Sequence, residues 1–143
     1  MHSCNYRIYY EDTDAGGIVY HANFLNYAER GRTEMLRSLG HSNIELQKDP
    51  GLLFIVRKAT VDYLSPGFLE DDLEIHTSVT EMRNTSLILK QSIFRPKDDT
   101  LLCDTEIVLV CVGTNLGKDG GPKHMKPIRI PDTVRKEFET YLN

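Results

Sequence analysis

One short segment combines residue types that suit acyl-transfer chemistry. It reads Asp12-Thr13-Asp14-Ala15-Gly16-Gly17-Ile18-Val19-Tyr20-His21-Ala22-Asn23 and ends where a helical pattern begins. N–H groups at a helix N-terminus are free and lie at the positive end of the helix dipole, so they stabilise a developing oxyanion. A carboxylate that faces a bound carbonyl acts as a general base or as a nucleophile. The residues alone leave a structural alternative open, in which Asp12 and Asp14 form a turn and His21 caps the helix.

Other chemical signatures are absent from the sequence. There is no GxSxG, HExxH, Walker or GxGxxG motif, and the five histidines show no metal-ligand spacing. We therefore expect no metal site. Cys4, Cys103 and Cys111 are odd in number and far apart, which indicates a reducing compartment, and the last two are expected to be small core residues.

A helix of about 17 residues is predicted after this segment, because apolar residues recur there at three- and four-residue steps up to Gly40. Asn23 or His21 is the expected cap. Gly31 lowers helix stability by about 1 kcal/mol relative to Ala, so its position beside Ala28 indicates close approach to another backbone, such as a sheet. The apolar stripe consists of Phe24, Tyr27, Ala28, Gly31, Met35, Leu36 and Leu39.

The rest of the pattern predicts an antiparallel sheet. A short strand is expected at residues 7–10, and period-two patterns predict strands at 52–64, 73–80 and 87–94. Residues 107–112 are apolar on both faces, which favours a strand in the middle of the sheet or at an interface. Shorter helices are expected at 43–48 and 131–141. The short turns at 83–84 and 96–99 imply antiparallel neighbours, so the predicted fold class is α+β, with the long helix on the concave face of the sheet.

Length and charge limit the function classes. The 143 residues fit one domain, residues 1–143, and the formal net charge of −4 argues against a dedicated nucleic-acid binder. Residues 116–130 carry a local charge of +3, which fits an anionic small molecule or a solvated loop. The longest apolar run, 107–112, is much shorter than the roughly 20 residues of a membrane helix, and the first residues lack an apolar signal region. We therefore expect a cytoplasmic protein without a membrane span.

One spaced pattern begins with Arg7-Ile8 and continues, after four residues, with Thr13-Asp14. After two more residues come Gly17-Ile18-Val19, and then His21 and Phe24. This pattern resembles the active-site signature of the 4-hydroxybenzoyl-CoA thioesterase family. Residues 10–21 are most similar to its YbgC-like branch, the Tol-Pal-associated acyl-CoA thioesterases. Residues 62–66, Asp-Tyr-Leu-Ser-Pro, resemble a second family segment. The resemblance spans roughly residues 5–114 and most of the remaining tail.

The resemblance implies the hotdog fold, in which a curved antiparallel sheet wraps around one long helix. It also implies hydrolysis of acyl-CoA, or of acyl carrier protein thioesters, without a metal or redox cofactor. Hotdog domains pair edge to edge with their sites between subunits, so a homodimer, and by further pairing a homotetramer, is expected. Acyl carrier protein or phospholipid-synthesis enzymes are the further partners that the YbgC-like resemblance suggests.

Site residues follow from the resemblance by position. Asp14 matches the catalytic carboxylate, which either attacks the thioester carbonyl or activates water. His21 matches the position at the helix mouth, where its backbone N–H polarises the carbonyl and its imidazole positions water or protonates the leaving thiolate. Gly17 and Ile18 are expected along the acyl channel, and Tyr10 is a weaker pocket candidate.

Coenzyme A is expected across the dimer interface, with its pantetheine arm along residues 61–65 and its phosphates near Arg83, Lys90 or the basic tail. The residues of that strand end are Val61, Asp62, Tyr63 and Ser65. Tyr20 and Tyr27 are expected to serve packing.

Three alternatives remain at this stage. Other hotdog thioesterases place their catalytic carboxylate on the central helix, where Glu29 lies here beside Arg30, although a salt-bridged helix glutamate is the interpretation that we favour. A hotdog hydratase or dehydratase would pair Asp14 with His21. A non-catalytic module would bind acyl-CoA or acyl carrier protein without turnover.

Overall fold

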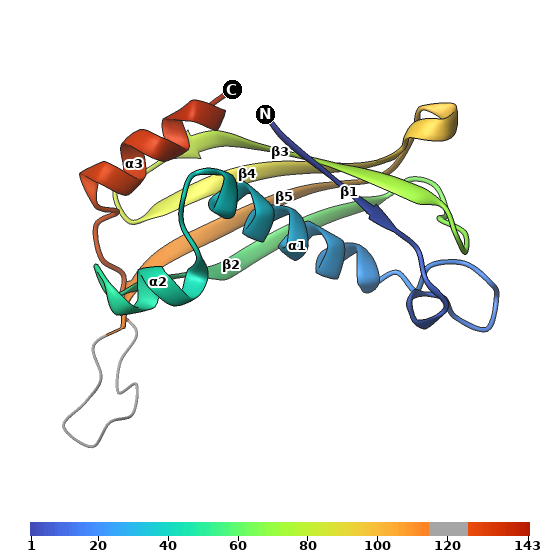
Figure 1. Cartoon of the computed structure of the whole chain (residues 1–143), viewed down its shortest axis with the longest axis horizontal. Coiled ribbons are helices and arrows are strands. Elements are labelled where there is room, and N and C mark those ends of the chain that lie inside the picture. Colours follow the sequence, from blue (N-terminus) through green and yellow to red (C-terminus); the bar gives the residue numbers. More distant parts are fainter. Residues whose placement is uncertain (115–125) are drawn as a thin grey trace, which may run out of the picture.

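The computed structural model describes residues 1–114 and 126–143. A five-stranded antiparallel sheet with the strand order β1-β3-β4-β5-β2 curves around one long helix, α1 (Figure 1). This arrangement confirms the predicted α+β class and the fold that the resemblance implied. The elements are β1 (His2–Arg7), α1 (Asn23–Ser38), α2 (Asn43–Lys48), β2 (Leu52–Tyr63), β3 (Asp72–Met82), β4 (Ser86–Arg95), β5 (Thr100–Gly113) and α3 (Asp132–Phe138).

The first strand lies earlier in the chain than predicted. β1 ends at Arg7, and Tyr10–Asp12 form a 3₁₀ turn. The carboxylate of Asp12 causes this change, because its Oδ2 accepts a hydrogen bond from the Tyr9 N–H at 2.8 Å. The Asp12 N–H in turn donates to the Tyr9 oxygen at 3.0 Å. Residues 8–10 look strand-like in the sequence, but they lie outside the strand because the Asp12 side chain closes a local turn there.

Two apolar clusters lie between α1 and the concave face of the sheet. One cluster surrounds Phe24 and Tyr27 in the first half of α1. The other surrounds Met35 and Leu36 in the second half and is closed by Phe138 of α3. All predicted stripe residues up to Leu36 are buried, so the helix packs with the face that its periodicity indicated.

Gly31 approaches the sheet as closely as the sequence suggested, although it meets side chains there. A Cβ at this position would lie 2.8 Å from Ile75 Cγ2 and 3.0 Å from Gln91 Nε2. Gln91 is itself fixed, because its Nε2 donates to the Ala28 oxygen at 2.8 Å and to Thr77 Oγ1 at 3.0 Å. The absence of a side chain at Gly31 lets α1 contact this buried polar group directly.

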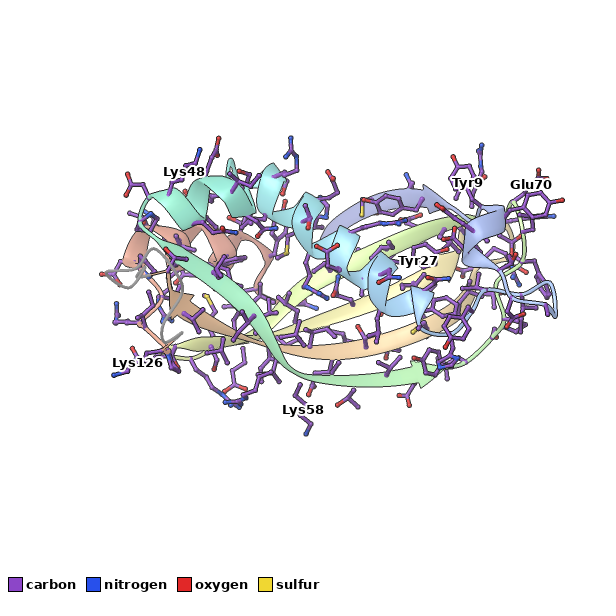
Figure 2. All side chains as sticks on the ribbon, turned by 90° about the horizontal axis from the view of Figure 1, so that it is seen from below. Tyr9, Tyr27, Lys48, Lys58, Glu70 and Lys126 are labelled. Atoms are coloured by element: carbon purple, nitrogen blue, oxygen red, sulfur yellow. The ribbon has the colours of Figure 1, made fainter. Side chains whose placement is uncertain are left out.

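The two long strands at one side of the sheet differ in their surroundings. β5 lies between β4 and β2, and residues 107–112 are buried as predicted. β2 is an edge strand with a bulge between Val56 and Lys58, and its residues 55–60 are exposed. Figure 2 shows Lys58 projecting outward from this edge. The long edge leaves a row of backbone donors and acceptors available for pairing.

The two ends of the sheet carry different elements. α2 and α3 lie at one end, and the segment between β1 and α1 lies at the other (Figure 1). No helix of the described ranges is long and apolar enough to cross a membrane. Residues 116–125 of the basic stretch at 116–130 lie outside the described residues. The end of the sheet at the start of α1 holds the segment with the chemical residues.

Candidate active site

Asp14 lies on a short hairpin that precedes α1. Thr13 pairs with Val19 in an antiparallel bridge, and the Asp14 N–H donates to the Ile18 oxygen at 2.9 Å. Gly17 closes the turn with a φ of +77°, a conformation that favours glycine. The Gly16 N–H donates to Asp14 Oδ1 at 2.8 Å. One oxygen of the exposed carboxylate is therefore held by the hairpin, and the carboxylate itself is accessible from solvent.

The start of α1 leaves two adjacent amides open. The N–H groups of Asn23, Phe24 and Leu25 donate to oxygens three residues back, at 2.9, 3.2 and 3.1 Å. No described residue accepts a hydrogen bond from the N–H of His21 or Ala22. These two amides lie at the positive end of the helix dipole, where an oxyanion would be stabilised.

The predicted helix cap is wrong. Ala22 occupies the N-cap position, and no side chain there accepts a hydrogen bond from the helix. The tight bonds of the first turn already satisfy the amides that a cap would serve. The carboxamide of Asn23 instead donates to the backbone oxygen of Asp12 at 2.8 Å. His21 directs its ring to aromatic neighbours.

The hairpin and the helix mouth are neighbours, and no hydrogen bond joins Asp14 to His21 among the described residues. The Tyr20 N–H donates to the Asp12 oxygen at 2.9 Å, which places residues 12 and 20 at the base of the hairpin. A reacting carbonyl needs about 3 Å to the nucleophile and about 3 Å to the oxyanion donors. The hydrogen bonds at the base of the hairpin thus place Asp14 and His21 in neighbouring segments at the start of α1.

The end of β2 borders the helix mouth. The Tyr63 ring lies 5.7 Å from the ring of His21 and 6.1 Å from that of Phe24, measured between centroids. Val61 packs against the apolar cluster beneath the first half of α1. The structure therefore brings the second family segment to the helix mouth. Tyr27 is buried in packing, whereas Tyr20 is half-exposed beside His21, so the packing prediction holds for Tyr27 alone.

Several predicted contacts lie elsewhere in the single chain. Asp62 and Lys90 share a shallow depression on the face of the sheet opposite α1, and Lys90 Nζ lies 3.7 Å from an oxygen of Asp104. Arg83 lies at the β3–β4 turn, where its Nε bonds Glu81 at 2.8 Å. That turn adjoins α3, at the end of the sheet away from the helix mouth (Figure 1).

The remaining predicted residues lie near the hairpin with different exposure. Tyr10 is 82% exposed on the 3₁₀ turn, so its side chain is open to solvent in the single chain. Ile18 pairs with Phe68, and both side chains are partly exposed. The Ser65 N–H donates to the Leu102 oxygen at 3.2 Å. The partly exposed apolar side chains of Ile18 and Phe68 thus lie together on the surface near the hairpin.

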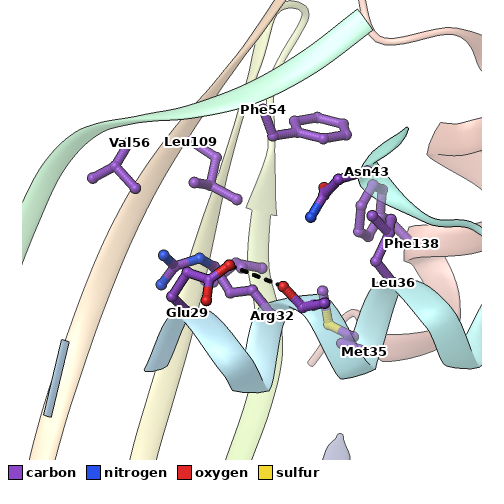
Figure 3. A pocket seen from close by; sticks show the side chains of 11 residues that line it. Glu29, Arg32, Met35, Leu36, Asn43, Phe54, Val56, Leu109 and Phe138 are labelled. Carbon is purple, nitrogen blue, oxygen red and sulfur yellow. Dashed lines mark hydrogen bonds between the residues drawn. The ribbon is translucent and has the colours of Figure 1, made fainter. Parts of the chain in front are cut away.

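A cavity of about 200 Å³ lies beneath the middle and second half of α1 (Figure 3). It does not include Asp14 or His21. The sequence reasoning missed this cavity, although the i, i+3 spacing of Glu29 and Arg32 beside the apolar stripe was a signal for polar groups at the edge of the core. The polar residues of its lining are Glu29, Arg32, Thr33 and Asn43. The apolar residues of its lining are Met35, Leu36, Phe54, Val56, Leu89, Leu109 and Phe138.

Glu29 is placed differently from the salt bridge that the sequence suggested. Its Oε1 accepts a hydrogen bond from the Thr33 hydroxyl at 3.0 Å (Figure 3). Arg30 instead lies over the ring of Tyr27 at 5.6 Å, and no ion pair of Glu29 is found among the described residues. Burial lowers the pKa of Arg32, whose Nη1 donates to Gln91 Oε1 at 3.0 Å.

Burial also affects the cysteines. It raises the pKa of the Cys103 thiol to about 12 and that of the Cys111 thiol to about 11. Both residues are buried as expected. Within the described ranges, no group of three or more His, Cys, Asp or Glu side chains is arranged to hold a metal ion. Of the two carboxylates that the sequence analysis considered for catalysis, Asp14 lies beside the helix mouth and Glu29 lines the cavity beneath α1.

The chain is similar to known thioesterases over most of its length. A family model described as the thioesterase-like superfamily matches residues 9–138. The acyl-CoA thioester hydrolase YbgC of Escherichia coli O6:H1 is 45% identical over 133 residues, which cover 93% of this chain and 92% of that protein. The acyl-CoA thioesterase YbgC of Haemophilus influenzae is 37% identical over 132 residues, covering 92% and 90%. The crystal structure of a probable thioesterase from Bartonella henselae superposes with a TM-score of 0.79 at 29% identity, covering 91% of this chain and 98% of that one.

Proposed function

The chain belongs to the thioesterase-like superfamily and is a thioester hydrolase of its YbgC-like branch, and from this premise we propose that it hydrolyses acyl-CoA at the mouth of α1. One observation carries the proposal. The open amides of His21 and Ala22 lie next to the hairpin that carries the accessible carboxylate of Asp14. Charge stabilisation and a base or nucleophile are thereby available at one surface.

The amides of His21 and Ala22 would bind the carbonyl oxygen of the thioester. Negative charge develops on this oxygen in the transition state, and each well-placed donor contributes about 100- to 1,000-fold to turnover. The donors are backbone groups, so they need no rearrangement when charge develops. The partial positive charge of the helix end adds to their effect.

Asp14 would act in one of two ways. As a general base, it takes a proton from water while the water oxygen bonds to the carbonyl carbon. The carbon–sulfur bond then breaks, and the thiolate of CoA receives a proton. As a nucleophile, an Asp14 oxygen bonds to the carbonyl carbon and expels the thiolate, and water then hydrolyses the resulting mixed anhydride. Both routes yield the free acid and CoA thiol.

The proposed substrate is an acyl-CoA, with acyl carrier protein as an alternative carrier of the acyl group. The pantetheine arm would follow the end of β2 past Tyr63, because this strand end borders His21. Gly17 and Ile18 would lie along the acyl channel. We propose that the reaction uses no metal or redox cofactor, since one carboxylate and two amides supply the required groups.

We further propose that two copies pair through β2. The exposed, unpaired edge of this strand would be completed by the same strand of a second copy. Such pairing would bury Ile55 and Val56, which are 39% and 49% exposed in the single chain. The site would then lie between subunits, and two dimers would pair into a tetramer in the cytoplasm.

The experiment that tests the function is a substrate screen with purified protein. Acyl-CoAs from acetyl- to palmitoyl-CoA are incubated with the chain, and released thiol is measured with a chromogenic thiol reagent. We expect catalytic thiol release from at least one member of the series. Hydration of crotonyl-CoA without thiol release would instead identify a hydratase. Binding of CoA esters without either reaction would identify a binding module.

A further inference from the structure

Asn23, the first residue of α1, joins the helix to the hairpin that carries Asp14. Its Nδ2 donates to the backbone oxygen of Asp12 at 2.8 Å, and the same oxygen accepts from the Tyr20 N–H at 2.9 Å. Both lone pairs of this carbonyl are thereby used. Asn26 Nδ2 donates to Asn23 Oδ1 at 3.0 Å, which orients the carboxamide with its nitrogen toward the hairpin.

Asp12 is held through its side chain as well. The residue is 6% exposed, and its Oδ2 accepts from the Tyr9 N–H at 2.8 Å. Tyr27 lies one turn after Asn23 on the same face of α1. Burial raises the pKa of Tyr27, and the neighbouring Asp12 carboxylate raises it further. Tyr27 and Val19 of the hairpin belong to the same buried apolar cluster, so the helix packs against the base of the hairpin at two successive turns.

The proposed reacting groups lie on the two sides of this joint. Asp14 follows Asp12 by two residues on the hairpin. The amides of His21 and Ala22 belong to the turn that the Asn23 N–H closes on Tyr20 at 2.9 Å. Any change in the angle between hairpin and helix therefore changes the distance between carboxylate and amides. A displacement of about 1 Å between reacting groups costs about 100-fold in turnover.

We propose that Asn23 is a positioning residue for thioester hydrolysis, because its carboxamide fixes the Asp14 carboxylate relative to the amides of His21 and Ala22. The inference rests on the proposed function. Asn23 has no contact with the substrate in this account. It acts by holding the Asp12 carbonyl, so its removal changes the geometry of the site and leaves every reacting group present.

If Asn23 had a purely structural role, turnover would fall only together with thermal stability, and the Asp variant separates this role from positioning. Replacement with Asp keeps the shape of the side chain and places a negative charge at the positive end of α1, which favours the helix. The same replacement turns the hydrogen-bond donor into an acceptor that faces the Asp12 oxygen. Under the proposal, thermal stability is therefore kept while turnover falls.

The test compares kcat, KM and Tm of the full-length wild type with those of Asn23→Asp, Asn23→Ala, Asp14→Asn and Asn5→Ala. The substrate is the CoA ester that the wild type hydrolyses fastest in the acetyl- to palmitoyl-CoA series. Asn5→Ala removes an exposed carboxamide from β1 and serves as the matched control. We expect kcat to fall about 10-fold in Asn23→Ala and about 100-fold in Asn23→Asp. KM and Tm are expected to stay close to wild type.

Two outcomes would overturn the proposal. One is a wild-type kcat in both Asn23 variants. The other is an equal loss in both that follows a fall in Tm, because this pattern reflects weakened folding. If Asn23→Asp fails to fold, the kcat of Asn23→Ala alone tests the proposal. This variant is expected to fold, since alanine is the residue that favours a helix most.

Asp14→Asn separates this inference from the proposed function. If that variant turns over like wild type, the role of Asp14 is wrong and the positioning role falls with it. If Asp14→Asn is inactive and the Asn23 variants are unaffected, the positioning role alone is wrong.

Discussion

The imidazole of His21 stands edge-on to the ring of Tyr63, with 5.7 Å between the ring centroids and an angle of 88° between the ring planes. This contact joins the first residues of the helix mouth to the end of β2. Edge-to-face aromatic pairs contribute about 0.5–1.5 kcal/mol beyond the area that they bury. The two segments that resemble family motifs, although about 40 residues apart, therefore form one surface.

Replacement of His21 tests whether its backbone or its side chain serves the reaction. His21→Ala keeps the N–H and loses the contact with Tyr63, so we expect kcat to fall by no more than about 10-fold. His21→Pro removes the N–H at the second position of the Tyr20–Asn23 turn, a position that tolerates proline. For this variant we expect a loss of about 100- to 1,000-fold. Steady-state kinetics with the best acyl-CoA provide the measurement.

Equal losses in the two His21 variants would contradict this prediction, because they would assign the reaction step to the imidazole. Circular dichroism and Tm of both proteins control for a disturbed helix start.

Replacement of Gly31 by alanine is expected to destabilise the fold even though alanine favours helices. The new Cβ would lie 2.8 Å from Ile75 Cγ2 and 3.0 Å from Gln91 Nε2. Overpacking of this kind costs about 1–3 kcal/mol, which exceeds the helix-propensity gain of about 1 kcal/mol. Gly113→Ala is the matched control, since its Cβ would meet Ile128 at an ordinary 3.5 Å. Urea unfolding of the two variants measures the difference, and a Gly31→Ala protein at least as stable as wild type would refute the expected clash.

The cysteines provide a prediction about pH. Burial raises the pKa of Cys4 and of Cys111 to about 11, and that of Cys103 to about 12. All three thiols should therefore react slowly with a thiol reagent at about pH 8 in the native protein, and fast after unfolding. Because the folded pKa values lie above those of the unfolded chain, their contribution to stability is constant below about pH 9 and is lost as the pH rises toward about 12.

Thiol titration in native buffer and in guanidinium checks the first part, and denaturant unfolding at increasing pH checks the second. Rapid native reaction of Cys103 would show that the β5 core opens readily, against this account.

The spacing of apolar residues and the residue types of the turns predicted much of the fold. The helix at residues 43–48 has the predicted bounds, and residues 107–112 lie mid-sheet because their apolar character on both faces requires cover from both sides. The first strand was misplaced, since the Asp12 carboxylate closes a turn over residues that look strand-like. Such a side-chain bond depends on geometry that no periodicity encodes.

The site was predicted less completely than the fold. The motif pointed to Asp14 and His21, whose catalytic roles stay predictions, and no described residue accepts a hydrogen bond from the N–H of His21. Asn23 was assigned to helix capping because of its residue type, but the tight first turn leaves its carboxamide free to bind the hairpin. The cavity beside Glu29 and Arg32 depends on the packing of three helices and three strands, which a single sequence does not specify.

Turnover by Asp14→Asn tests the central claim most directly, because this change keeps the shape of the side chain and removes its charge. We predict that kcat for the best acyl-CoA falls at least about 100-fold, with Tm and affinity for CoA unchanged. Asp132→Asn, which removes an exposed carboxylate from α3, should turn over like wild type. Asp14→Asn hydrolysis within about twofold of wild type, in a fully folded protein, would contradict the claim that this carboxylate drives the reaction.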